Sequence, residues 1–154
     1  MKKTITLFLL ACLFTPLVNA ADNGLISIKS QFPVPHTTDR LIGLIQKKGL
    51  TLFKLVKHSE RAKRVGIKMQ PTELIIFGNP KIGSPLMKCA PTFAIDLPQK
   101  FLVWQDKNQQ TWITYNNPIY IADRHELPTE CRGSLHKIAT LLENLSRIAG
   151  DTVN

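Results

Sequence analysis

Alternating hydrophobic and polar residues predict β-strands at several places along the chain. Residues 25–30 alternate imperfectly, and residues 51–57 are rich in strand-forming types. Residues 73–77 form a nearly continuous apolar run, which predicts a strand that is buried on both faces. Residues 100–105 and 111–115 flank the polar turn 106–110, so they predict a β-hairpin with aromatic residues on both arms.

Helical spacing of apolar residues predicts helices between and after these strands. A helix is expected where Leu41, Ile42 and Ile45 recur, with Thr37 or Thr38 as its N-cap and a stop at Gly49. Shorter helices are expected over residues 59–64 and, after a proline, over 119–125. Residues 135–149 form the clearest amphipathic stripe in the sequence. Neighbouring strands with helices at both ends predict an α+β fold, an antiparallel sheet covered by helices that include a C-terminal amphipathic helix.

The first twenty residues have the pattern of a secretory signal peptide. Lys2 and Lys3 give a positive start, an apolar stretch follows, and small residues precede a cleavage point after Ala20. Pro16 interrupts the apolar stretch, which is too short for a permanent membrane helix. We therefore expect residues 1–20 to be a signal peptide, residues 21–154 to form a single α+β domain, and the mature protein to be periplasmic or secreted and not an integral membrane protein.

A lipoprotein is the alternative interpretation of this segment. Leu9-Leu10-Ala11-Cys12 resembles a lipoprotein processing box, which would leave Cys12 lipidated. The apolar core before Cys12 is short, however, and further apolar residues follow it, so the signal-peptide interpretation is favoured.

The chain is basic, with a formal net charge of +9. Without Lys2 and Lys3, 18 basic and 11 acidic residues remain, a net charge of +7. Export argues against nucleic acid as the partner, so an anionic surface, either lipid or polysaccharide, or an acidic protein is expected instead. The densest basic cluster, which could also be only a solvated face, consists of Lys54, Lys57, Arg61, Lys63, Arg64 and Lys68, preceded by Lys47 and Lys48.

Two cysteines, Cys89 and Cys131, remain after removal of the signal peptide. In an oxidising compartment they are candidates for a structural disulfide, with two free thiols as the alternative. Their spacing is not that of a redox-active Cys-x-x-Cys pair.

The stretch Phe77 to Met87, FGNPKIGSPLM, superficially resembles a phosphate-binding loop. Its second glycine is followed by Ser84 and a proline where the nucleotide-binding motif requires lysine and a hydroxyl residue, so nucleotide binding is excluded. The stretch instead predicts a turn at Gly78 and Asn79, followed by a short helix with Ser84 as its N-cap. With Lys81 nearby, such a helix start could hold a small anion.

Few residues with chemically reactive side chains follow a recognisable pattern. Glu73 and His125 could exchange protons if the fold brings them together, but no nucleophile–base signature accompanies them. The histidines and cysteines lack the close spacing of a metal chelate, so neither a metal nor a cofactor is expected.

Several uncommon strings occur in the order typical of the domain-of-unknown-function 302 family, which this chain resembles over residues 27–127. The matching positions are Thr38, Leu41, His58, residues 71–81, Gly83, Pro85 to Met87, Asp96 to Pro98, Val103 to Asp106, Trp112, Tyr115, Asn116, Pro118, Arg124 and His125. The resemblance implies a curved antiparallel sheet carrying helices, similar to TATA-box-binding-protein-like domains. The family is named for having no assigned activity, so the resemblance implies none, and similarity to the fold of a DNA-binding protein is not evidence of DNA binding.

We therefore expect a periplasmic binding or interaction module for an unknown ligand, without chemical turnover. The expected ligand-binding residues are His58, Glu73, Asn79, Lys81, Ser84, Arg124 and His125. A small enzyme or metal-binding protein that uses His58, Glu73 and His125 is the alternative. Self-association into a homodimer through a sheet edge is a third interpretation.

Overall fold

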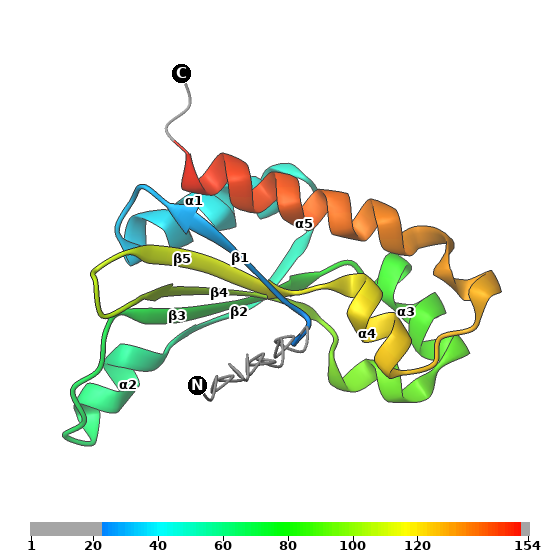
Figure 1. The fold of residues 1–154 in the computed structure, drawn as a ribbon, viewed down its shortest axis with the longest axis horizontal. Helices are drawn as coiled ribbons and strands as arrows, with labels where there is room; N and C mark the ends of the chain where they lie inside the picture. Colours follow the sequence, from blue (N-terminus) through cyan, green and yellow to red (C-terminus); the bar gives the residue numbers. More distant parts are fainter. Residues whose placement is uncertain (1–22, 152–154) are drawn as a thin grey trace, which may run out of the picture.

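The structure is an α+β fold built on a five-stranded antiparallel sheet, described for residues 23–151 by a computed structural model (Figure 1). Its strands are β1 (Leu25–Ser30), β2 (Thr51–Lys57), β3 (Thr72–Gly78), β4 (Gln99–Gln105) and β5 (Thr111–Asn116), in the spatial order β1-β5-β4-β3-β2. Its helices are α1 (Val34–Lys47), α2 (His58–Arg64), α3 (Pro80–Cys89), α4 (Pro118–Arg124) and α5 (Leu135–Gly150), with 3-10 helices η1 (Pro91–Ile95) and η2 (Thr129–Ser134). The predicted fold class is confirmed. The expected signal peptide and Cys12 lie outside the described residues.

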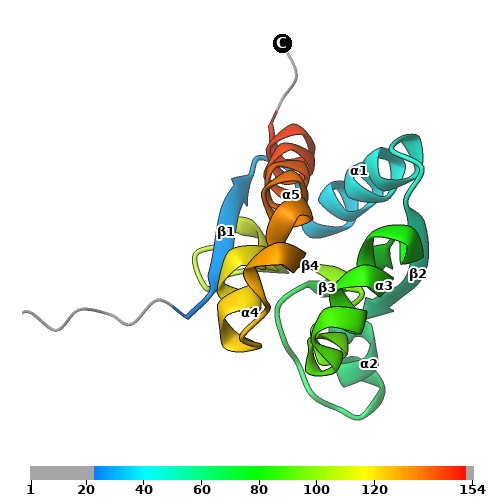
Figure 2. The same cartoon turned by 90° about the vertical axis from the view of Figure 1, so that its right-hand side faces the viewer.

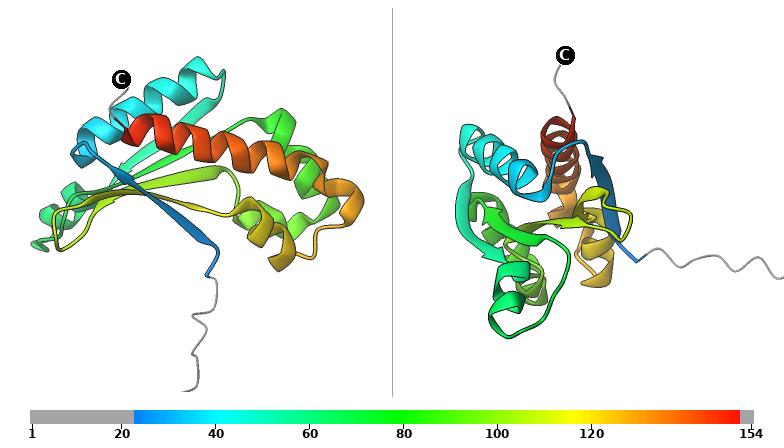
Figure 3. Two further views of the ribbon diagram at one scale, coloured as in Figure 1. Left: turned by 45° about the horizontal axis from the view of Figure 1, so that its top comes forward. Right: turned by 90° about the vertical axis from the view of Figure 1, so that its left-hand side faces the viewer.

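Helices α1 and α5 lie side by side over one face of the curved sheet, while α3 and α4 lie at one end of the sheet and α2 at the other (Figures 1 and 3). Figure 2 shows the same two-layer arrangement from the end that carries α3 and α4. The core fills the space between the sheet and the pair of long helices, and burying each large apolar side chain there contributes about 1.5–3 kcal/mol. Its fully buried members are Leu41, Ile45, Ile75, Phe101, Val103, Ile113, Ala122 and Ala149.

The two faces of the sheet differ, which corrects the prediction that β3 is buried on both faces. Alternate residues of β3, namely Glu73, Ile75 and Phe77, are buried toward the helices, whereas Leu74 and Ile76 on the other face are only half-buried. An antiparallel sheet with helices on one side needs full burial on that side only. The apolar run therefore reflects residues that favour β-strands, and not burial of the strand on both faces.

The predicted hairpin of β4 and β5 is present. Trp104 and Trp112 are directly paired across it on the face without helices. Trp104 Nε1 donates to Thr114 Oγ1 at 2.8 Å, and Trp112 Nε1 donates to Asp106 Oδ2 at 2.9 Å. The indoles are thus held as part of the sheet surface, as packing residues.

Two predicted helix starts are wrong. The first helix begins at Val34 with Pro33 as its N-cap, and Thr37 and Thr38 are buried inside it. Its second residue is Pro35, which the first turn of a helix tolerates because the N–H there has no intrahelical partner. Burial of Val34 adds apolar contact and favours the extra turn.

The third helix begins at Pro80 and not after Ser84. Asn79 is its N-cap, because the Asn79 Oδ1 accepts from Lys81 N at 2.9 Å and Pro80 occupies the first helical position. Pro85, expected at the start of the helix, lies inside it.

The long α5 is anchored to α1 and β1 at its C-terminal end. Arg40 of α1 donates from Nε to Ala149 O at 2.8 Å and from Nη2 to Ile148 O at 2.7 Å, and so satisfies carbonyls that a helix end leaves without partners. Gln31 N donates to Gly150 O at 2.9 Å. The predicted stripe of α5 faces the core, except that Ile148 is 45% exposed.

Candidate functional site

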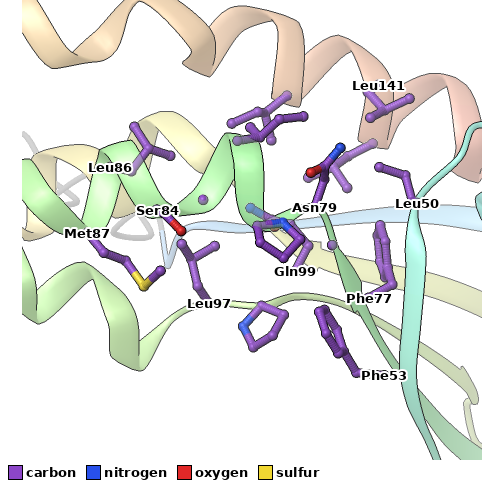
Figure 4. A pocket seen from close by; sticks show the side chains of 17 residues that line it. Leu50, Phe53, Phe77, Asn79, Ser84, Leu86, Met87, Leu97, Gln99 and Leu141 are labelled. Atoms are coloured by element: carbon purple, nitrogen blue, oxygen red, sulfur yellow. The ribbon is translucent and has the colours of Figure 1, made fainter.

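An apolar pocket opens at the end of the sheet that carries α3 (Figure 4). The stretch FGNPKIGSPLM supplies one continuous part of its wall, because β3 runs into the turn and the turn into α3. The rest of the wall comes from the start of β2, the segment before β4 and the face of α5. The lining residues are Leu50, Phe53, Phe77, Gly78, Asn79, Pro80, Ile82, Gly83, Ser84, Leu86, Met87, Leu97, Pro98, Gln99, Ile138, Leu141 and Leu142.

The local sequence of this wall explains its shape. With Asn79 as N-cap and Pro80 at the first position, α3 starts directly at the end of β3. A Cβ placed on Gly83 would lie 3.4 Å from Leu97 Cδ1, an ordinary van der Waals contact with the opposite wall of the pocket. A larger side chain at Gly83 would therefore project toward the pocket.

The pocket is small and chemically uniform. Its volume is about 210 Å³. Two apolar side chains at its wall remain substantially exposed, Phe53 at 48% and Ile82 at 39%. None of the described lining residues has an ionisable side chain, and the side chains that can form hydrogen bonds are those of Asn79, Ser84 and Gln99. The Oδ1 of Asn79 accepts the N-cap bond, so Ser84 offers a hydroxyl and Gln99 a complete amide, while Asn79 offers its Nδ2 donor. Such a lining suits a small, mainly apolar, uncharged molecule.

A disulfide ties α3, which lines this pocket, to the segment that leads into α5. Cys89, the last residue of α3, is bonded to Cys131 in η2, which leads directly into α5. The predicted pairing is therefore present in the structure. It constrains the distance between α3 and the start of α5, and thus two parts of the pocket wall.

A second group of polar residues lies beside the pocket, at the junction of η1 and α4. His125 Nε2 lies 2.6 Å from Asp96 Oδ2, and His125 Nδ1 lies 3.0 Å from Thr92 Oγ1. Arg124 Nη1 is 3.5 Å from the same Asp96 oxygen. The His125 side chain is only 8% exposed, whereas that of Arg124 is 55% exposed. These contacts tie the end of α4 to the turn that supplies Leu97 to the pocket.

Lys100 completes the hydrogen bonding of that turn. Its Nζ donates to the carbonyl oxygens of Asp96 and Pro98, both at 2.9 Å. Partial burial lowers the pKa of Lys100, and the negative charge of Asp96 opposes that shift. The residues before β4 are thus held by a lysine from within the strand and by a histidine and an arginine from α4.

The structure separates His125 from the other two residues of the predicted enzyme or metal site. Glu73 is buried at the end of the sheet near α2, where its Oε1 lies 3.8 Å from Lys57 Nζ across the β2–β3 pair. His58 is exposed at the start of α2, and His125 ends α4 at the other end of the sheet (Figure 1). No group of three or more metal-ligating side chains comes together within residues 23–151.

Of the seven predicted ligand-binding residues, only Asn79 and Ser84 line the apolar pocket. Arg124 and His125 belong to the neighbouring group around Asp96, which we call the Asp96 cluster and which also includes Thr92. Lys81 is exposed on α3 outside the lining. The apolar lining residues were missed as site residues. They come from separate parts of the chain, and leucines or phenylalanines in each part predict only core packing.

The predicted basic cluster lies on β2, on α2 and in the segment after α2. Lys57 forms ion pairs with Glu60 at 3.2 Å and with Glu73 at 3.8 Å. The hydrogen bond and charge of Glu60, followed by the charge of Glu73, raise the pKa of Lys57. No residue of α2 is buried.

Over the described part of the chain, helices are too short or too polar to cross a membrane.

Comparison with known proteins places the chain in a sequence family. The family model described as "Domain of unknown function DUF302" matches residues 26–145. Proteins named "Fluoride-specific ion channel FluC 1" from Brucella suis biovar 1 and Brucella abortus biovar 1 are both 38% identical over 114 residues, which are 74% of this chain. The match spans 45% and 42% of those two proteins, so this chain covers less than half of their length.

A solved structure supports the fold. The crystal structure of an uncharacterised conserved DUF302 protein from Bacillus stearothermophilus superposes with a TM-score of 0.74 at 15% sequence identity. The superposition covers 84% of this chain and 99% of that chain.

Proposed function

Because this chain belongs to the DUF302 family, whose description assigns no activity, we propose its function from the pocket: it is an exported module that binds a small, mainly apolar ligand without chemical turnover. The observation that carries the proposal is the apolar, uncharged lining of the pocket between β3, α3 and α5. Export, a single domain over residues 21–154 and cleavage after Ala20 are parts of this proposal that derive from the sequence.

The size of the pocket defines the ligand class. A dry cavity of about 150 Å³ lined by apolar side chains holds benzene. At about 210 Å³, this pocket suits one aromatic ring with a short substituent, or a short branched acyl group. Ser84 and Gln99 add a hydroxyl and an amide for a neutral polar end of the ligand, such as a hydroxyl or carbonyl group.

The Cys89–Cys131 disulfide supports an oxidising compartment, because disulfides persist mainly in exported proteins. The basic cluster adds an anionic partner to the proposal, independently of the pocket. Pairing of two copies through the edge strand β2 is disfavoured as a route to a homodimer, because a bulge between Leu52 and Lys54 interrupts this strand. Bulges and lysines are features that discourage pairing between sheet edges.

The name of the Brucella relatives is not extended to this chain. Fluoride specificity and channel activity are stated for whole proteins, of which this chain spans less than half. Binding of fluoride requires hydrogen-bond donors or cations, and this pocket offers mainly apolar side chains.

The test uses the methyl groups of methionine, of which the chain has three. Met87 lines the pocket, and Met69 lies outside it. With ¹³C-methyl methionine, titration with toluene should shift the Met87 signal with a Kd on the order of 0.1–1 mM and leave Met69 unchanged. Gly83→Leu should abolish the shift by filling the pocket. Gly43→Leu, in a helix where no atom lies within 4 Å of the added Cβ, is the matched control and should bind like the wild type.

An unshifted Met87 signal at the solubility limit of toluene, of phenol and of isovaleramide would refute the proposal. Equal loss of binding in the Gly43→Leu variant would also count against it, because the effect would then not come from filling the pocket.

The alternative function, a small enzyme, is favoured by one observation. Thr92, His125 and Asp96 place a hydroxyl, an imidazole and a carboxylate in a row, as in acyl-transfer triads, although the hydroxyl here meets Nδ1 and the carboxylate Nε2, the reverse of the usual assignment. None of the three lines the apolar pocket, so a substrate would have to bind elsewhere. Hydrolysis of p-nitrophenyl acetate that is lost in both Thr92→Val and His125→Gln, with both variants still folded at the assay temperature, would establish this alternative.

A further inference from the structure

The segment formed by α2 and residues 65–71 projects from the sheet at the end opposite α3 and α4 (Figure 1). It is joined to β2 on one side and β3 on the other, and all seven residues of α2 are at least partly exposed. The segment turns back at Gly66, whose φ of +79° is a conformation that favours glycine. The turn leaves the residues on both sides of Gly66 at the outer part of the molecule.

Large apolar side chains at this turn face water. Val65 is 72% exposed, Ile67 is 60% exposed and Met69 is 44% exposed. We call these three residues the apolar tip. Single exposed apolar residues are common on proteins, but three within five positions at a projecting turn form a local apolar surface that a partner can cover.

The apolar tip alternates with basic residues. The order is Lys63, Arg64, Val65, Gly66, Ile67, Lys68, Met69. From Lys57 to Gln70 there are five basic residues and one acidic residue, a net charge of +4. The acidic residue, Glu60, is already paired with Lys57 at 3.2 Å.

A shallow depression lies between α2 and the returning segment. It has a volume of about 580 Å³. Lys63 and Lys68 line it together with Glu60, Ile67 and Met69. Two ammonium groups and two apolar side chains of the same depression could contact the phosphate and the first acyl carbons of one lipid.

We propose that the apolar tip and the basic residues beside it dock this protein on an anionic lipid bilayer. The tip enters the interfacial region, and the basic side chains contact headgroup phosphates. A bilayer presents negative charge directly beside an apolar phase over its whole surface, which matches the alternation of basic and apolar residues in this segment. Nucleic acid provides negative charge without an apolar phase. Contact with the same segment of a second copy of the chain would bring two segments of net charge +4 together, and they would repel each other.

The test measures co-sedimentation of the full chain with vesicles of pure phosphatidylcholine or of phosphatidylcholine with 30% phosphatidylglycerol (about one lipid in three). We expect stronger binding to the anionic vesicles, and weaker binding as salt is added. Because each basic residue near such a surface contributes about fivefold in affinity, replacing Lys63, Arg64 and Lys68 by glutamine should weaken binding at least tenfold. Replacing the three tip residues by serine should weaken it by a similar factor. All proteins carry the same N-terminal segment, so differences between them report the projecting segment.

Matched controls test whether the position of these side chains matters, or only the number of basic and apolar residues on the surface. The triple variant Lys81→Gln, Lys88→Gln and Lys137→Gln removes the same charge from exposed positions elsewhere, and the triple variant Leu25→Ser, Ile95→Ser and Ile148→Ser removes three exposed apolar side chains elsewhere. Both controls should retain wild-type binding within about threefold. Equal loss in a control and in its test variant would overturn the proposal, as would equal binding to both kinds of vesicle.

A second readout places the contact on the molecule. Vesicles with a nitroxide on the lipid acyl chain should broaden the methyl signal of Met69 and leave that of Met87 sharp. Broadening of Met87 instead would mean that the pocket end meets the membrane, which contradicts the proposal. The toluene titration does not depend on vesicles, so docking and pocket binding can fail independently.

Discussion

Cys89 at the end of α3 is bonded to Cys131 in η2, so one covalent link ties a helix that lines the pocket to the segment that leads into α5, which lines the same pocket. The chain between these cysteines contains η1, β4, β5 and α4. The link therefore connects segments that are close in space and separated by 42 positions in sequence. It contributes both to global stability and to the position of the pocket wall.

Loss of this disulfide should destabilise the protein and weaken the pocket. Closing a loop of this length contributes about 4 kcal/mol in the chain-entropy description, so the Cys89→Ser, Cys131→Ser variant should lose roughly 2–4 kcal/mol of unfolding free energy. Urea denaturation measures this loss, and the toluene titration measures the expected rise in Kd. Dithiothreitol should affect the wild type only. Identical urea midpoints for the wild type and the variant would disprove the structural role of the bond.

Acid should weaken the β4–β5 hairpin through Asp106. The hydrogen bond from Trp112 Nε1, together with the backbone N–H groups of Gln110 and Asn108, lowers the pKa of Asp106 from its ordinary value of 3.8. The unfolded chain therefore takes up this proton at a higher pH than the folded protein. The stabilising contribution is complete above the ordinary pKa and is lost as the pH falls through the lowered value.

The measurement compares melting temperatures of the wild type and Asp106→Asn between pH 6 and pH 2.5 (roughly the range over which carboxylates protonate). Asparagine keeps an acceptor oxygen for the turn and removes the titrating group, so the melting temperature of the variant should fall less. Parallel curves for the two proteins would show that Asp106 does not contribute to acid sensitivity.

Local pattern was sufficient for most of the fold. The bounds of β1 and β2 coincide with the predicted ranges, because each strand is bounded by residues that break it, such as Gly24 and Gly49, which have positive φ. The long C-terminal helix also follows from its apolar period. Helix starts were less predictable, because several residues near each start can act as caps. At α3, Asn79 takes the N-cap role that was assigned to Ser84.

The pocket could be predicted only in part. The sequence of Phe77 to Met87 predicts a turn and a helix start, and it predicts Asn79 and Ser84 as ligand contacts, which both line the pocket. Leu50, Leu97 and Leu141 meet in the pocket because of the order of the strands and the position of α5 across the sheet. Neither of these can be read from the spacing of residues along the sequence. In the same way, Asp96 and His125 are 29 positions apart and make contact only in the folded protein.

Gly150 should be intolerant of a side chain. A Cβ at this position would lie 2.7 Å from Lys29 O, a backbone atom that cannot move without shifting β1. Gly150→Ala should therefore lower the unfolding free energy by about 1–3 kcal/mol, the usual cost of overpacking. Gly133→Ala is the control, because no atom lies within 4 Å of its added Cβ. Thermal and urea unfolding measure both variants, and equal stability of the two would show that α5 has room to move away from β1.

The Asp96 cluster should stabilise the turn beside the pocket far more than a comparable surface ion pair on α4. Asp96 is hydrogen-bonded to His125 and forms an ion pair with Arg124, and its side chain is only 14% exposed. Asp96→Asn replaces a carboxylate by an amide between two cationic or donor groups, so it should lower the unfolding free energy by about 1.5–3 kcal/mol.

Asp123 provides the matched comparison, because it pairs with Arg132 and its side chain is 62% exposed. Asp123→Asn should cost about 0–1 kcal/mol, as is usual for exposed pairs. Urea denaturation measures both losses. Since Asp96 precedes Leu97 of the pocket wall, Asp96→Asn should also raise the Kd for toluene, whereas Asp123→Asn should leave it unchanged. If the two variants lose equal stability and bind toluene equally, the cluster is only a surface ion pair, and the position of Leu97 must be set by packing and by the two hydrogen bonds from Lys100.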